Sequence, residues 1–209
     1  MTDLQKDKKV AGVILAGGLS SRMGGGDKSL LELGGKPLLS RVIERAAPQV
    51  DTLMLNANGD PARFACYGLP VVADVVPDFA GPLAGILTGM HWVREHAPAC
   101  QWLASFASDT PFFPQDLVSR MVQQAEKEQA PLACAVSQER SHPVFGLWSL
   151  ALIEDLHRAV VEEDMRKIMR WTDRYSCSLV EFTAVPFDPF FNINRPEDLR
   201  AAEELLGQA

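Results

Sequence analysis

The chain has 209 residues, with 20 lysines and arginines against 27 aspartates and glutamates, which gives a formal net charge of −7. Hydrophobic residues make up 47% of the sequence and charged residues 22%, the composition of a globular protein whose length suits one domain with a sizeable core. The negative charge argues against binding to nucleic acid or an anionic membrane through bulk charge, because both need a concentrated positive field. The sequence shows neither a secretion signal nor an apolar stretch that could span a membrane, so we expect a cytoplasmic protein.

The four cysteines, Cys66, Cys100, Cys134 and Cys177, lie far apart in the sequence. No CxxC pair and no Cys/His cluster offers a metal or redox site. We therefore expect buried, reduced thiols.

Short apolar runs alternate with amphipathic segments along the chain, a pattern typical of βαβ units and a mostly parallel sheet. The predicted strands are residues 10–15, 52–56, 69–73, 102–107, 132–136, 144–148 and 178–183, and residues 191–194 extend the series. Helices are predicted after Pro37, after the segment 81–85 to about Glu95, over 117–125 and 150–161, and from Pro196. No internal repeat or linker divides the sequence, so residues 1–209 are predicted to form a single-domain, Rossmann-like three-layer α/β/α sandwich.

The segment 16–28 is dense in glycine and follows the first predicted strand directly. Glycines let backbone N–H groups approach an oligophosphate, and Arg22 and Lys28 can neutralise its charge, so the segment predicts a triphosphate-binding loop at the carboxyl end of a strand. The spacing is neither that of a P-loop nor that of a dinucleotide-binding GxGxxG motif. The alternative is a glycine-rich structural turn.

Asp109 follows the predicted strand 102–107 and is a candidate ligand for Mg²⁺ beside the bound phosphates. The alternative is that it caps a helix, because Asp before Thr-Pro is also a helix-start signature.

Asn56 and Asp74 stand at the carboxyl ends of two further predicted strands. A carboxylate can accept hydrogen bonds from N1–H and the exocyclic amine of guanine together, and neither cytosine nor uracil presents that pair of donors. Asp74 therefore suits guanine recognition, although an Asp or Asn at a strand end is also ordinary turn chemistry. His142, at the entry to a predicted strand, is a weaker candidate for substrate contact.

These motifs together resemble those of the molybdenum cofactor guanylyltransferase (MobA) family within the nucleotidyltransferase superfamily. The similarity lies in five elements that occur in the same order: Leu15-Ala16-Gly17-Gly18 with Arg22-Met23-Gly24-Gly25 and Asp27-Lys28, then Asn56 in Leu55-Asn56-Ala57-Asn58, Asp74 with Gly81-Pro82-Leu83-Ala84-Gly85, Asp109-Thr110-Pro111, and Asn192-Ile193-Asn194 before Pro196-Glu197. The resemblance covers nearly the whole chain and implies the fold of the nucleotide-diphospho-sugar transferases.

The resemblance also implies roles for individual residues. Lys28, Asp109 and Arg22 would carry the catalysis, Asp109 would bind Mg²⁺, and GTP would be held by Leu15, Ala16, Gly17, Gly18, Lys28, Asn56, Asp74 and Asp109. The N-terminal half would bind GTP and the C-terminal half the acceptor, near His142, Asn192 and Asn194. The implied reaction is transfer of GMP from GTP to the terminal phosphate of molybdopterin or Mo-molybdopterin, with release of pyrophosphate. Molybdoenzyme apoproteins or their chaperones would be further partners.

Two other functions remain open at this point. The same fold could serve a cytidylyltransferase or a sugar-phosphate nucleotidyltransferase, a reading that Asp74 argues against. A non-catalytic GTP-binding module would bind GTP without releasing pyrophosphate.

Overall fold

A computed structural model describes residues 9–16, 28–76 and 81–207. Its centre is a seven-stranded sheet with the order β5-β4-β1-β6-β8-β7-β9. The strands are β1 (Val10–Leu15), β4 (Thr52–Asn56), β5 (Val71–Val72), β6 (Trp102–Ala107), β7 (Leu132–Ser137), β8 (Arg140–Ser149) and β9 (Cys177–Glu181). Only β8 runs antiparallel to its neighbours, and every other pair in this sheet is parallel.

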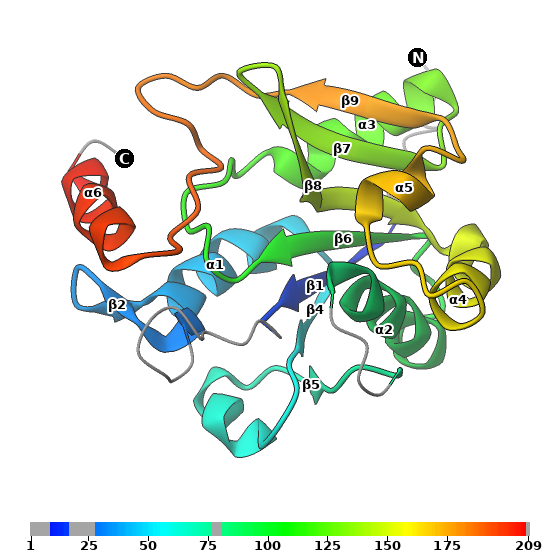
Figure 1. Ribbon diagram of the computed structural model, residues 1–209, viewed down its shortest axis with the longest axis horizontal. Coiled ribbons are helices and arrows are strands. Elements are labelled where there is room, and N and C mark those ends of the chain that lie inside the picture. The colour runs from blue at the N-terminus through cyan, green and yellow to red at the C-terminus, as the bar shows by residue number, and fades with distance from the viewer. Residues whose placement is uncertain (1–8, 17–27, 77–80, 208–209) are drawn as a thin grey trace, which may run out of the picture.

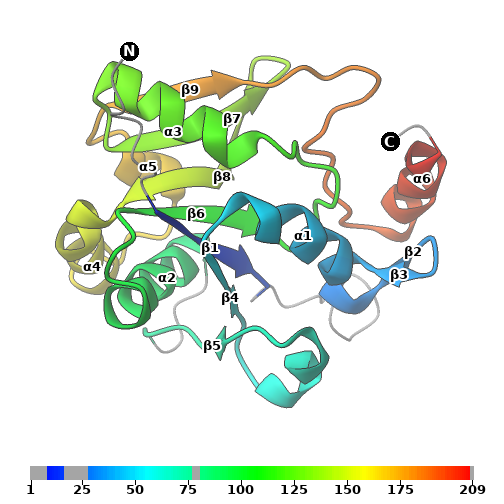
Figure 2. The same ribbon diagram turned by 180° about the vertical axis from the view of Figure 1, so that it is seen from behind.

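Helices cover both faces of the sheet and complete the three predicted layers (Figures 1 and 2). The helices are α1 (Leu38–Ala46), α2 (Pro82–His96), α3 (Leu117–Glu128), α4 (Ile153–Val161), α5 (Ile168–Thr172) and α6 (Pro196–Leu206). Val10 and Ile14 of β1 pack in a core with apolar side chains of α1 and α3. Ala11 and Val13, which point to the opposite face, pack with α2, α4 and α5. This alternation explains why β1 reads as a continuous apolar run.

A third, smaller core lies beside the sheet and joins the C-terminal helix to the N-terminal half. There α6 packs near the two-stranded hairpin of β2 (Glu32–Leu33) and β3 (Lys36–Pro37), as both ribbon views show (Figures 1 and 2). Phe112 and Ile193 contribute to the same core. The end of the chain is thereby attached to the segment that follows Asp109.

Strand β8 begins earlier than the sequence predicts and carries an irregularity. Its register with β7 shifts between Cys134 and Ala135, close to Pro143, which cannot donate a ladder hydrogen bond. The buried hydroxyl of Ser105 donates to the carbonyl oxygen of Val144 at 2.6 Å, which satisfies a backbone group within the irregular stretch.

Some predicted elements are shorter than expected or absent. The strand predicted at 69–73 is confined to the two residues of β5, and residues 191–194 form no strand. The described residues add α5, the hairpin and three short 3₁₀ segments, which are η1 (Lys28–Leu30), η2 (Ala47–Gln49) and η3 (Pro61–Tyr67). The helix predicted over 150–161 forms as the 3₁₀ segment η4 (Leu150–Leu152) followed by α4. Within the described part of the chain, none of the helices has the length and apolarity that crossing a membrane requires.

Candidate functional site

The polar residues predicted at strand ends meet along one edge of the sheet. Leu15, the last residue of β1, pairs with Asn56 of β4 on one side and with Ala107 of β6 on the other. The backbone N–H of Ala16 donates to the carbonyl oxygen of Asn56 at 2.9 Å. Asn56 and Asp109 therefore flank the point where β1 ends, which is where open α/β sheets bind their ligands.

Lys28 joins two distant parts of the chain at this edge. Its ammonium group donates to Asp109 Oδ2 at 2.6 Å and to Asn194 Oδ1 at 2.6 Å. The Lys28 and Asp109 side chains are only 16% and 21% exposed, so water screens this pair less than it would an ion pair on the open surface. The backbone N–H of Ile193 also donates to the carbonyl oxygen of Asp109 at 2.9 Å, which fixes the two segments against each other. The cluster presents one cation, one carboxylate and one amide at a single point.

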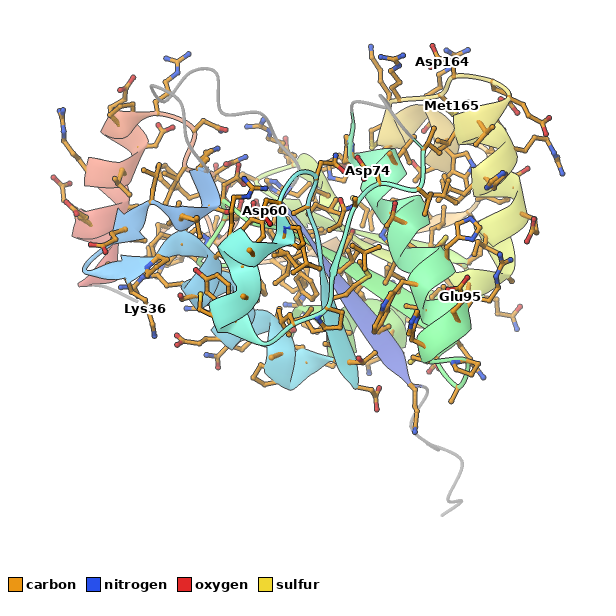
Figure 3. All side chains as sticks on the ribbon, turned by 90° about the horizontal axis from the view of Figure 1, so that it is seen from below. Lys36, Asp60, Asp74, Glu95, Asp164 and Met165 are labelled. Atoms are coloured by element: carbon orange, nitrogen blue, oxygen red, sulfur yellow. The ribbon has the colours of Figure 1, made fainter. Side chains whose placement is uncertain are left out.

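A second polar cluster surrounds Asp74. Asn56 Nδ2 donates to Asp74 Oδ1 at 2.9 Å, and Asn58 Nδ2 donates to Asp74 Oδ2 at 2.8 Å. Asn56 is only 4% exposed and also donates to the carbonyl oxygen of Val72 at 3.2 Å. Figure 3 shows Asp74 near the N-terminal end of α2, whereas Glu95 lies at the other end of that helix. The two predicted base-reading residues are thus in direct contact.

Gly85 of α2 makes room for this cluster. A Cβ atom at this position would overlap Asn56 Oδ1 and come within 2.8 Å of Leu15 Cδ2. The helix can approach the end of β1 and the buried Asn56 side chain only because the residue is glycine. The GPLAG segment therefore has a packing role at the site, which its position after Asp74 in the sequence does not show.

His142 lies apart from both clusters and makes a network of its own. Its Nε2 atom is 2.7 Å from the hydroxyl oxygen of Ser137, and that hydroxyl donates to Asp188 Oδ1 at 2.8 Å. Since the hydroxyl proton goes to Asp188, Nε2 is the donor toward Ser137, and the ring stacks on Phe190 with 4.4 Å between centroids. Burial lowers the pKa of His142; the Asp188 charge opposes this shift, and Arg140 adds to it.

The remaining candidates have simpler surroundings. Asn192 is exposed, and Gly17, Gly18 and Arg22 lie outside the described residues. Of the four free cysteines, Cys100 and Cys134 are buried as expected, and Cys177 is partly buried. Burial raises the pKa of the Cys134 thiol to about 12. The expectation of burial is wrong for Cys66, which is exposed within η3.

A metal ion at this edge would need ligands beyond the acidic, histidine and cysteine side chains of the described residues. In residues 9–16, 28–76 and 81–207, no three His, Cys, Asp or Glu side chains are grouped to hold an ion. Mg²⁺ is commonly held by one or two carboxylates together with substrate phosphates, and all its ligands are oxygens. The partly buried carboxylate of Asp109, at the end of β6, fits that donor chemistry.

The fold and the two polar clusters fit a nucleotidyltransferase, and comparison with known proteins shows that the chain belongs to that class. The MobA-like NTP transferase domain matches residues 12–176. Molybdenum cofactor guanylyltransferase from Rhodopseudomonas palustris (strain BisB5) is 55% identical over 193 residues, 92% of each chain. The enzyme of the same name from Bradyrhizobium sp. (strain ORS 278) is 56% identical over 196 residues, 94% of this chain and 92% of that one.

A solved structure shows the same fold. Molybdopterin-guanine dinucleotide biosynthesis protein A from Archaeoglobus fulgidus superposes with a TM-score of 0.74 at 23% identity, over 95% of this chain and all of that one. The chain belongs to the MobA-like NTP transferase family, as the order of its sequence motifs predicts.

Proposed function

We propose that this nucleotidyltransferase transfers GMP from GTP to the terminal phosphate of molybdopterin, or of its molybdenum-loaded form, in a reaction that depends on Mg²⁺. The observation that carries the proposal is the Lys28–Asp109–Asn194 cluster at the end of β1 and β6. The relatives' name, molybdenum cofactor guanylyltransferase, supports the same substrates.

The reaction needs alignment and charge neutralisation more than it needs a base. An oxygen of the acceptor phosphate, already ionised, attacks the α-phosphorus of GTP; the new O–P bond forms as the bond to the β-phosphate oxygen breaks, and pyrophosphate leaves. The two reactants are anions that repel each other, so a cation held at the point of transfer lowers the barrier. Lys28 supplies that cation, and Asn194 and Asp109 hold its ammonium group in place.

Other residues of the N-terminal half bind the nucleotide in this proposal. Leu15, Ala16 and the glycine loop with Gly17, Gly18 and Arg22 would contact the phosphates and ribose. Asp109 would hold Mg²⁺, which supplies positive charge to the phosphates when bound. Asn56 and Asp74 would select guanine.

The C-terminal half would hold the acceptor. Asn194 reaches the catalytic cluster directly, whereas His142 lies elsewhere on the same edge of the sheet, on strand β8, where it pairs with Ala135 of β7. We propose residues 1–209 as one domain with these two halves, which passes its product to molybdoenzyme apoproteins or their chaperones.

The test is release of pyrophosphate with Mg²⁺ and molybdopterin, with GTP, CTP, ATP and UTP compared in parallel. We expect release with GTP, and much less with the other three nucleotides. Preference for CTP would replace the nucleotide assignment with that of a cytidylyltransferase. Binding of GTP without pyrophosphate release under these conditions would refute the guanylyl transfer.

A further inference from the structure

Both polar groups of the Asn58 side chain form hydrogen bonds with Asp74. Its Nδ2 donates to Asp74 Oδ2 at 2.8 Å, and its Oδ1 accepts from the backbone N–H of Asp74 at 2.9 Å. Asn58 is exposed, so its amide could form these hydrogen bonds with water and keep its side-chain freedom. It bonds to Asp74 instead, and this reciprocal pair fixes both the backbone and the carboxylate of Asp74.

Asn56 and Asn58 bind different oxygens of the Asp74 carboxylate. Asn56 donates to Oδ1 and Asn58 to Oδ2, so each oxygen accepts one amide hydrogen bond. A carboxylate offers about four acceptor positions, which leaves room for one further donor on each oxygen. Guanine presents two donors side by side, N1–H and the exocyclic amine, and a carboxylate held in one orientation can accept both.

Asn58 itself stands on a fixed segment. Its carbonyl oxygen accepts from the Arg63 guanidinium at 2.6 Å, and Arg63 Nε donates to the carbonyl oxygen of Asp60 at 3.0 Å. The Asp60 side chain in turn caps η3 by accepting from the backbone N–H of Ala62 at 2.9 Å. The loop after β4 thus holds Asn58 in position against Asp74.

We infer that Asn58 is a positioning residue for base selection, which orients the Asp74 carboxylate so that the enzyme discriminates GTP from ITP. ITP retains the N1–H donor of guanine and lacks the exocyclic amine, so it reports on the second of the two contacts. The inference rests on the proposed function, in which Asp74 reads guanine. It adds a residue that acts on the base only through another side chain.

Two substitutions of Asn58 distinguish orientation of the Asp74 carboxylate from simple support of the loop after β4. Asn58→Ala removes both hydrogen bonds to Asp74. Asn58→Asp keeps an oxygen that can accept from the Asp74 backbone N–H, but it replaces the amide donor with a negative charge facing Asp74. If Asn58 only supports the loop, the Asp variant is the milder one; if it orients the carboxylate, the Asp variant is the more harmful.

The experiment measures kcat/KM for GTP and ITP, with molybdopterin and Mg²⁺ saturating, and the equilibrium affinity for each nucleotide without acceptor. Loss of one hydrogen bond to a charged group corresponds to about a 10- to 100-fold preference, so we expect the wild type to favour GTP over ITP by that factor. Asn58→Ala should reduce the preference to about threefold or less, and Asn58→Asp should also weaken GTP binding further. Asp60→Ala, which removes the η3 cap but leaves both hydrogen bonds between Asn58 and Asp74, should lower the ratio less than Asn58→Ala does.

The outcomes distinguish the two proposals. If Asp74→Ala loses the GTP preference while both Asn58 variants keep it, the role of Asn58 is wrong and the guanylyl transfer stands. A milder effect of Asn58→Asp than of Asn58→Ala, or an equal loss in Asp60→Ala, also overturns the inference. If the wild type itself neither prefers GTP nor releases pyrophosphate from it, the proposed function fails and the inference fails with it.

Discussion

Replacing Gly85 by alanine tests whether packing of α2 against Asn56 supports nucleotide recognition. Alanine would favour the helix by about 0.5–1 kcal/mol, but its Cβ would overlap Asn56 Oδ1 and come within 2.8 Å of Leu15 Cδ2. Overpacking of this kind costs about 1–3 kcal/mol, so we expect a net loss of up to about 2.5 kcal/mol in the free energy of unfolding. For a chain of this length, that corresponds to a fall in Tm of up to roughly 10 °C. Because Asn56 is buried, its amide can relieve the overlap only by moving relative to Asp74.

Gly89→Ala is the matched control, one turn further along the same helix. Its Cβ would meet only apolar side chains, within 2.9 Å of Leu103 Cδ2 and 3.2 Å of Val13 Cβ. We expect a similar fall in Tm in both variants, measured by thermal unfolding. Only Gly85→Ala should weaken GTP binding, by about 10- to 100-fold in a titration well below Tm, the effect of losing a hydrogen bond to a charged group. Equal GTP affinities in two folded variants would refute the link between α2 packing and the base-reading cluster.

Three further predictions concern charge. Lys28→Ala should lower kcat/KM by about 10²- to 10³-fold while thermal unfolding shows an intact fold. The control is Lys36→Ala, which removes a hairpin lysine that pairs with Glu44 and should leave turnover unchanged. Asp109→Ala should abolish Mg²⁺-dependent turnover, and a metal titration that matches the wild type would contradict the role of its carboxylate. Burial lowers the pKa of His142, so the fold favours the neutral ring. Since an unfolded histidine titrates near about 6.5, stability should fall as the pH drops below that value, and His142→Gln should flatten the fall in a pH series of unfolding curves.

The sequence predicts the central strands and the edge they share because those signals are local. The apolar runs that became β1, β4 and β6 have the predicted limits, since each strand is buried on both faces and reads as continuous apolar sequence. The start of α1 after Pro37 and the start of α6 at Pro196 follow from prolines and apolar spacing in the same way. The edge strand β5 is shorter than predicted, and it pairs with a single neighbour, so pairing with the rest of the sheet constrains its length less.

The contacts of the candidate site depend on distant segments, and no local pattern encodes them. The reciprocal contact between Asn58 and Asp74 spans 16 residues, and Asn58 does not stand at the end of a strand, so sequence reasoning missed it. The overlap that would follow a Cβ at Gly85 is also invisible until α2 lies against β1. Periodicity and turn chemistry specify which elements form, whereas tertiary packing decides which side chains touch.

The contact between Lys28 and Asn194 joins residues 166 positions apart and has a consequence for how the protein is made. During synthesis the N-terminal segment emerges first, and nearly the whole chain must follow before Asn194 exists to meet it. Such long-range closures form late, because the entropy of a long loop opposes them until other contacts have reduced it. The Lys28–Asp109–Asn194 cluster therefore forms only once the chain is almost fully synthesised. A truncated or nascent chain can bury much of its sheet and still lack Asn194, one of the two partners that hold the catalytic ammonium group.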